Sequence, residues 1–168
     1  MIQLFAQPYD VSATGFYFES AEQYEARVAK AANRYGEPVD EFEIQFIDGD
    51  DLDCSLARAW GLSQGSIAAF FEATETWDED QKVRFVIAVG ECGYSFDPQT
   101  DAPDGYDVDL YDVDSMRELA KQFVDEGLFG DIPERLRFYL DYEAIARDLS
   151  MDYTETVIAG QPYAYRCG

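Results

Sequence analysis

The sequence predicts an α+β fold, with short strands near both ends of the chain and helices between them. Three observations favour this class: apolar and polar residues alternate in short terminal runs, apolar residues recur at helical spacing in between, and capping residues precede the helical runs. Hydrophobic residues make up 47% and aromatic residues 15% of the 168 positions. Such a chain can bury a core, which a disordered acidic chain cannot.

The N-terminal elements are predicted to be a small sheet and one helix. Strand-like runs occupy residues 2–6 and 15–19. A helix is expected over residues 20–36, with Ser20 as its N-cap and Gly36 as the residue that ends it.

A strand and three short helices are expected next. In the run 41–47, acidic or amide residues alternate with apolar ones from Glu41 to Phe46, which predicts a strand with one buried face. Helices are then predicted over residues 52–61, 63–73 and 78–93, each preceded or followed by Asp, Ser or Gly.

The clearest helix signal in the chain begins at Ser115. Ser115 and Glu118 have the Ser-x-x-Glu spacing of a capping box, and Gly127 is expected to end the helix. An apolar stripe at helical spacing is formed by Met116, Leu119, Ala120, Phe123 and Val124.

Two further helices and two strands are predicted towards the C-terminus. Asp131 is expected to cap one helix and Asp141 the other, and strand-like runs follow at residues 153–158 and 162–166.

Shifts in composition predict three small domains. One shift lies near residue 48, and the second lies in a stretch that contains Pro and Gly before the C-terminal third. The predicted domains are 1–48 with the sheet and helix, 49–100 with short helices, and 101–168 with helices and a small sheet.

The charge is the dominant feature of the composition. Thirty-five acidic residues against 12 basic ones give a net charge of −23, and residues 101–116 hold six aspartates without a basic residue between them. Ordinary nucleic-acid binding is disfavoured, because it needs a basic surface that displaces phosphate counterions. No signal peptide and no apolar run of about 20 residues is visible, so we expect a cytoplasmic protein.

Catalytic and metal-binding patterns are weak. The chain has no histidine, no phosphate-binding glycine loop and no clustered cysteines, so we expect no catalytic residue, no cofactor and no metal. An EF-hand needs glycine at its sixth position, but the register from Asp48 places Asp53 there, and the register from Asp107 places Asp112 there. The Asp-x-Lys at 80–82 and a glycosidase-type carboxylate pair leave an acid-rich enzyme open as an alternative.

The spread of the acids favours an extended polyanionic surface. A charge of −23 equals that of about 39 Å of B-DNA, at one charge per about 1.7 Å of helix axis. A DNA mimic is one reading, a binding module for another basic DNA-binding protein is a second, and a solubility or halophile surface is a third.

A resemblance separates these alternatives. Residues 118–155 resemble the ArdA antirestriction proteins carried by plasmids, transposons and phages, most of all in "FVDEGLFGDIPE" (123–134) and "YLDYEAIARDL" (139–149), whereas the N-terminal part departs more from the family. The resemblance implies an elongated three-domain protein that dimerises through its C-terminal domain and imitates bent B-DNA. The implied partner is the DNA-binding core of type I restriction–modification enzymes, which it would block without being an enzyme itself.

The resemblance also assigns candidate residues. The carboxylates expected to replace phosphates are Asp48, Asp50, Asp51, Asp53, Asp101, Asp104, Asp107, Asp109, Asp112, Asp114, Asp125, Glu126, Asp131, Glu134, Asp141, Glu143 and Asp148. For Asp131 and Asp141, helix capping is an equally good explanation.

A second set of residues is expected at the dimer interface, because the C-terminal domain has more apolar side chains than about sixty residues easily bury. These residues are Leu110, Tyr111, Leu128, Phe129, Phe138, Tyr139 and Tyr142. Arg27, Lys30 and Arg34 interrupt the acidic pattern, and we expect them to pair with nearby glutamates.

Overall fold

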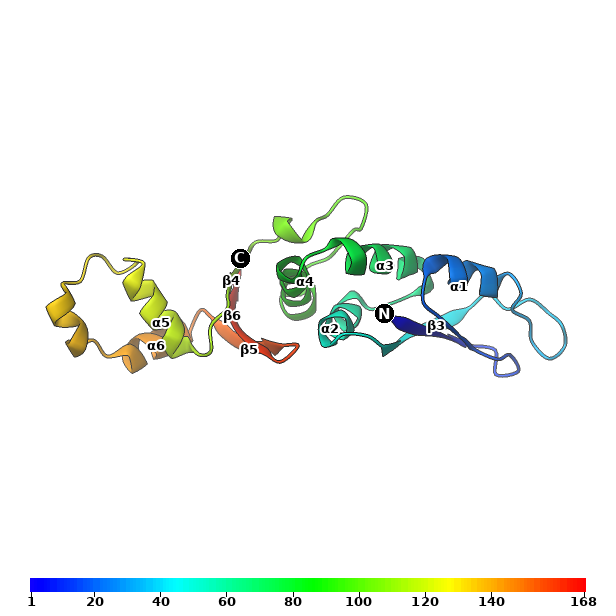
Figure 1. Cartoon of the computed structure of the whole chain (residues 1–168), viewed down its shortest axis with the longest axis horizontal. Coiled ribbons are helices and arrows are strands. Elements are labelled where there is room, and N and C mark those ends of the chain that lie inside the picture. Colours follow the sequence, from blue (N-terminus) through cyan, green and yellow to red (C-terminus); the bar gives the residue numbers. More distant parts are fainter. The chain divides into compact units, whose positions relative to one another are not determined.

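The structure, a computed structural model, describes all 168 residues and has the predicted α+β class. The chain divides into two compact units, the N-terminal unit Met1–Gly105 and the C-terminal unit Tyr106–Gly168 (Figure 1). Each unit has its own three-stranded antiparallel sheet. The division lies close to the predicted boundary after residue 100, and the further boundary after residue 48 stays a prediction.

The sheet of the N-terminal unit has the strand order β2-β1-β3. Its strands are β1 (Gln3–Pro8), β2 (Phe16–Phe18) and β3 (Phe42–Asp48). Phe42 and Ile44 of β3 are buried while the glutamates beside them are exposed. The alternation therefore predicted the strand and its buried face correctly.

Helix α1 (Ala21–Val28) covers this sheet and is shorter than predicted. Its N-cap is Ser20, as expected, whose Oγ accepts a hydrogen bond from the backbone N–H of Gln23 at 3.2 Å. The helix ends at Val28, so Gly36 does not end it and lies in a later turn with φ of +80°.

Asn33 explains why the helix stops early. Its side-chain oxygen accepts hydrogen bonds from the backbone N–H groups of Tyr35 at 2.9 Å and Glu37 at 3.0 Å. Its Nδ2 donates to Asp10 at 3.1 Å and to Glu37 at 3.0 Å. A side chain that bonds to nearby backbone competes with helical hydrogen bonds, and here the turn replaces the last turns of the predicted helix.

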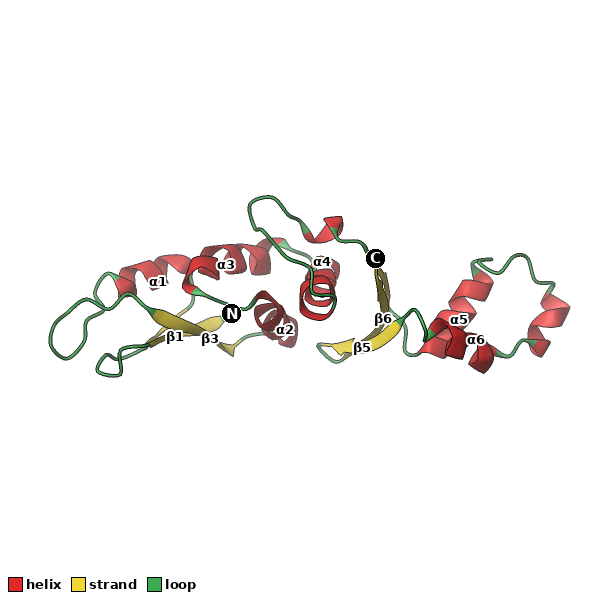
Figure 2. Cartoon of the chain, turned by 180° about the vertical axis from the view of Figure 1, so that it is seen from behind, coloured by secondary structure: helices red, strands yellow, loops and turns green.

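The remainder of the N-terminal unit is a set of short helices (Figure 2). All three predicted helices are present, as α2 (Asp51–Trp60), α3 (Ile67–Thr76) preceded by η1 (Gln64–Ser66), and α4 (Glu79–Phe85) continued by the π-helical η2 (Val86–Glu91). A final 3₁₀ turn, η3, spans Pro103–Gly105.

Aromatic packing holds these helices together. Trp60 and Trp77 stack with ring centroids 5.6 Å apart, and Phe85 meets Phe96 edge to face at 4.9 Å. Helices this short are unstable alone, so their stability comes from this packing.

The sheet of the C-terminal unit has the order β4-β6-β5. Strands β5 (Thr154–Ile158) and β6 (Gln161–Cys167) agree with the predicted runs. Strand β4 (Val108–Tyr111) lies inside the aspartate-rich stretch, where we predicted no regular element.

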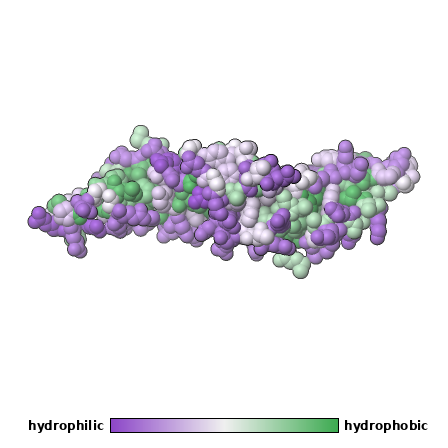
Figure 3. All heavy atoms as spheres, turned by 90° about the horizontal axis from the view of Figure 1, so that it is seen from above, coloured by the Kyte–Doolittle hydropathy of each residue, from purple (hydrophilic) through white to green (hydrophobic).

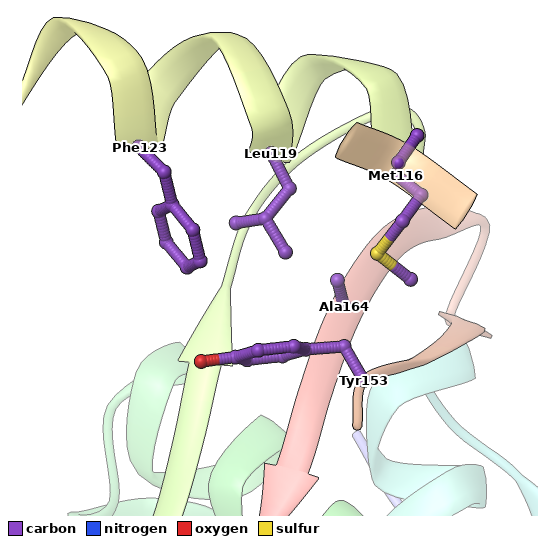
Figure 4. Packing of buried hydrophobic residues seen from close by; sticks show 6 residues of the cluster. Met116, Leu119, Phe123, Tyr153 and Ala164 are labelled. Carbon is purple, nitrogen blue, oxygen red and sulfur yellow. The ribbon is translucent and has the colours of Figure 1, made fainter. Parts of the chain in front are cut away.

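Helix α5 (Met116–Asp125) supplies five of the eleven buried hydrophobic residues of this unit. Ser115 caps it by accepting a hydrogen bond from the N–H of Glu118 at 3.2 Å, and all five residues of the predicted stripe are buried. Figure 4 shows side chains of α5 pointing towards Tyr153 and Ala164. Gly127 has φ of +77°, which an L-residue with a side chain rarely adopts, and it follows the end of the helix as predicted.

The two remaining helical elements of this unit are η4 (Glu134–Tyr139) and α6 (Tyr142–Leu149). Asp141 caps α6, since its Oδ1 accepts a hydrogen bond from the N–H of Ala144 at 3.1 Å. Asp131 does not cap a helix, because η4 begins only after Pro133, and that part of the prediction was wrong. None of the helices is both long and apolar enough to cross a membrane.

Candidate functional site

The aspartate-rich stretch is organised by strand β4. Val108 is buried and anchors the strand, while Asp107 is exposed and Asp109 is partly exposed on the opposite face of the pleat. Asp109 lies opposite Arg166 of β6, whose Nη2 and Nε donate to Asp109 Oδ2 at 2.5 and 3.0 Å. The hydrogen bond with Asp109 raises the pKa of Arg166, and the positive charge of the guanidinium offsets the negative charge of the carboxylate beside it.

Next to β4, acidic side chains line an open hollow along α5. Its lining residues are Asp112, Val113, Asp114, Glu118, Lys121, Gln122, Asp125 and Glu126. Lys121 is the one cation among them, and its Nζ pairs with Glu118 at 3.1 Å. The surplus of carboxylates makes the hollow strongly negative, which favours a cationic partner.

Two more of the predicted carboxylates of the C-terminal unit have exposed basic partners. Asp125 accepts a hydrogen bond from Arg137 Nη1 at 2.8 Å, and Glu143 accepts one from Arg117 Nη1 at 3.1 Å. Exposed pairs of this kind are worth at most about 1 kcal/mol, so a competing cation can open them.

The N-terminal unit exposes Asp48, Asp50 and Asp51 in the turn before α2 and in its first turn. Further along, Asp101 Oδ2 accepts a hydrogen bond from the N–H of Asp97 at 2.8 Å, and Asp104 Oδ2 accepts one from Gln81 at 2.9 Å. Asp101 and Asp104 are exposed and oriented by neutral donors, so their negative charge remains available.

The structure contradicts the prediction that Asp53 is one of the carboxylates that replace phosphates. Asp53 is only 6% exposed, and its Oδ1 lies 2.8 Å from the Nζ of Lys82. A buried carboxylate paired with its own lysine cannot contact a partner protein, so Asp53 stabilises the packing of α2 on α4 instead.

Six of the predicted carboxylates are exposed and have neither an ion pair nor a side-chain hydrogen bond within their unit. They are Asp50, Asp51, Asp114, Asp131, Glu134 and Asp148. Hydrophilic residues cover most of the face of the molecule drawn in Figure 3, with smaller apolar areas among them.

The apolar candidates divide into two groups. Leu128, Phe129, Phe138 and Tyr139 are exposed, up to 93% for Phe138, and Leu136 beside them, which the sequence analysis did not include, is exposed as well. They all lie between α5 and α6, in the segment 128–139.

The other apolar candidates are partly covered. Leu110 and Tyr142 are half-buried. Tyr111 packs against the core, with its ring centroid 5.3 Å from Phe123 and 5.9 Å from Tyr153, and its place at a dimer interface stays a prediction.

Sequence reasoning missed the basic residues that neutralise individual carboxylates. Lys82 pairs with an aspartate on another helix and Arg166 with an aspartate on another strand. No local sequence pattern predicts such contacts. In contrast, Arg27, Lys30 and Arg34 were expected to pair with nearby glutamates, and none of them forms an ion pair, so that expectation was wrong.

No group of three or more His, Cys, Asp or Glu side chains in the chain is arranged to hold a metal ion. A family model described as antirestriction protein (ArdA) matches residues 19–163, which covers most of both units. No curated protein matches the chain.

Proposed function

Because the chain belongs to the ArdA family of antirestriction proteins, we propose that it occupies the DNA-binding groove of type I restriction–modification enzymes as an acidic mimic of B-DNA. Such a groove contains lysine and arginine side chains that bind the phosphates of DNA. A carboxylate that occupies a phosphate position accepts hydrogen bonds from the same lysine and arginine donors. The inhibitor would therefore compete with DNA for one set of contacts.

The observation that carries this proposal is the excess of carboxylates. Even if each of the 12 basic side chains neutralised one acid, 23 of the 35 carboxylates would have no cation in the chain. Their total charge equals that of about 39 Å of B-DNA. The six exposed carboxylates without a partner are the first candidates to replace phosphates, and the oriented ones such as Asp101 and Asp104 are next.

Membership of the ArdA family favours a role as an inhibitor over a role as an enzyme. We therefore propose that the protein has no catalytic residue and needs no cofactor or metal. Its proposed target works on DNA inside the cell, so we propose that the protein acts in the cytoplasm. A gene for such an inhibitor would benefit a mobile element that enters a restricting host.

We also propose a homodimer formed through the exposed apolar segment 128–139. Phe138 and Tyr139 are 93% and 84% exposed, which is unusual for large apolar side chains that lie close together in the chain. A second copy that buries these rings would remove them from water. The dimer would double the charge of the mimic.

The proposal is tested by competition on a purified type I methyltransferase core. Labelled duplex that carries the recognition site is displaced by increasing amounts of the protein over a series of salt concentrations. We expect mutually exclusive binding and an affinity that falls as salt rises, because the groove exchanges bound anions for carboxylates as it does for phosphates. A ternary complex with DNA, or a salt-independent affinity, would show that the protein does not imitate DNA.

A further inference from the structure

A hollow of about 150 Å³ in the N-terminal unit is lined by aromatic rings and carboxylates and by no basic residue. Its walls come from the end of α2, from one face and the end of α3, and from the loop between η2 and η3 (Figure 1). We call it the aromatic hollow and define it by Trp60, Glu72, Trp77, Phe96 and Asp101. Its remaining lining residues are small and uncharged.

The three rings of the aromatic hollow are held in place by one another. Trp60 and Trp77 stack with their centroids 5.6 Å apart, and Phe96 meets them edge to face at 5.1 and 5.8 Å. The fully buried Phe85 packs against all three, at 5.0, 5.3 and 4.9 Å. Trp60, Trp77 and Phe96 are themselves only partly buried. The aromatic wall is therefore preformed and can be reached from solvent.

The two carboxylates of the aromatic hollow have no cationic partner. Glu72 and Asp101 are exposed and form no ion pair, and Asp101 is oriented by the backbone N–H of Asp97, which donates to it at 2.8 Å. The surrounding chain is acidic as well. Residues 58–104 contain nine acidic and three basic residues, and one of these bases, Lys82, already forms an ion pair. The charge of the hollow and its surroundings therefore favours a cation.

An arginine side chain fits the size, the walls and the charge of the aromatic hollow. The faces of aromatic rings carry negative partial charge and attract cations. A guanidinium is planar, stacks on aromatic rings and is more weakly hydrated than the ammonium of lysine, so it loses less when it leaves water. A cavity of about 150 Å³ can hold one benzene molecule, and a guanidinium with part of its stem is of similar size.

We infer that the aromatic hollow binds one arginine side chain of a protein partner, with the guanidinium against the rings and ion-paired with Glu72 and Asp101. The inference rests on the proposed function for the identity of the partner, because in that complex the arginine belongs to the DNA-binding groove of the restriction enzyme. Arginines of DNA-binding proteins contact base edges as well as phosphates. Surface carboxylates replace phosphates, and the aromatic hollow gives such an arginine a deeper contact.

A short peptide tests the aromatic hollow without any restriction enzyme. The probe is acetyl-Gly-Arg-Gly-amide, and the control peptide carries citrulline, which has nearly the shape of arginine without its charge. Trp60 and Trp77 are the two tryptophans of the chain, so both indole N–H signals in a proton–nitrogen NMR spectrum report on the hollow. We expect both signals to shift saturably with the arginine peptide at about millimolar concentration, and much less with the citrulline peptide.

Two matched variants connect the aromatic hollow with the complex. The hollow variant is Glu72→Gln with Asp101→Asn, and the control variant is Glu75→Gln with Asp80→Asn, two exposed acids of the same unit that do not line the hollow. Both variants lose two negative charges, so mimicry by charge alone predicts equal losses of competition with DNA. We expect the hollow variant to bind the methyltransferase core about tenfold more weakly than the control variant. Circular dichroism confirms that both are folded.

The outcomes separate the aromatic hollow from the proposed function. Equal shifts with the two peptides, or no shift with either, overturn the inference. A hollow variant that competes with DNA as well as the control variant overturns it too. If the wild-type protein does not displace DNA at all, the proposed function fails, and the peptide titration still decides whether the hollow binds arginine.

Discussion

Asp53 of α2 and Lys82 of α4 form an ion pair of 2.8 Å whose side chains are only 8% and 13% exposed. It joins two short helices that lie far apart in the sequence. Many surface carboxylates of this protein have no basic partner, whereas Asp53 is buried and stabilises the fold. The loss of one partner would leave the other charge buried without compensation.

Asp53→Asn should therefore destabilise the N-terminal unit by about 3 kcal/mol. Asp51→Asn is the matched control, because Asp51 is exposed in the first turn of the same helix, and it should change stability by less than about 1 kcal/mol. Urea unfolding followed by far-UV circular dichroism measures both. Equal stabilities of the two variants would mean that the pair has no structural role.

Asn33→Ala should loosen the turn that ends α1. The variant loses the acceptor for the N–H groups of Tyr35 and Glu37, and alanine favours the helix that the sequence otherwise predicts. We expect a loss of about 1–2 kcal/mol and a rise in helical chemical shifts over residues 29–32, measured by NMR. Arg34→Ala is the control, because the guanidinium of Arg34 lies over the Tyr35 ring and donates no hydrogen bond to the backbone of the turn. A turn that survives in Asn33→Ala would contradict the explanation.

The stability of the loop between β1 and β2 should depend on pH through Asp10. The backbone N–H and the hydroxyl of Ser12, followed by Asn33, donate hydrogen bonds that lower the pKa of Asp10 below its ordinary value. A carboxyl group with a lowered pKa in the folded state stabilises it above the unfolded-state pKa, and this contribution is lost as pH falls through the folded-state value. The loop should therefore loosen only below about pH 4.

Ser12→Ala tests this cause. The variant retains the backbone donor but loses the hydroxyl, so the pKa of Asp10 should rise towards its ordinary value. A titration of the carboxyl carbon by NMR compares the two proteins directly. Identical titration curves would assign the shift to another group.

The elements that the sequence predicted well are those determined by local contacts. Ser115 and Asp141 cap their helices as expected, and the stripe of α5 is buried, because capping and periodicity depend on residues within a few positions. The predicted helix over 20–36 was too long because Asn33 bonds to Asp10 on another loop. Strand β4 was missed because Val108 and Leu110 alternate with aspartates in a stretch too short to stand out, and it forms only beside β6.

The candidate site was predictable as a charge distribution but not residue by residue. Asp51 and Asp53 are two positions apart in one helix, and only contact with α4 makes one of them buried. Likewise, Asp109 is neutralised by Arg166, which is remote in sequence and opposite in the sheet. These differences depend on tertiary contacts, which a single sequence does not reveal.

Replacement of the unpaired carboxylates should show that inhibition is collective. Asp114→Asn alone should weaken competition with DNA by less than about tenfold, because an exposed charge pair is worth at most about 1 kcal/mol. Neutralisation of all six unpaired carboxylates should weaken it by more than about a hundredfold and reduce the salt dependence. The fold should survive, with equal or greater stability as repulsion is relieved. Abolition of binding by one substitution in a folded protein would instead indicate a localised site.

The exposed segment 128–139 should control assembly. Light scattering on the wild-type protein at micromolar concentration should give twice the 19.1 kDa of one chain. Phe138→Ser with Tyr139→Ser should give a folded monomer, because each ring removed from the interface takes away a large buried apolar area. Met151→Ser with Val157→Ser, which are also exposed in the C-terminal unit, should remain dimeric. A wild-type mass of one chain would exclude the dimer, and loss of assembly in both variants would place the interface beyond this segment.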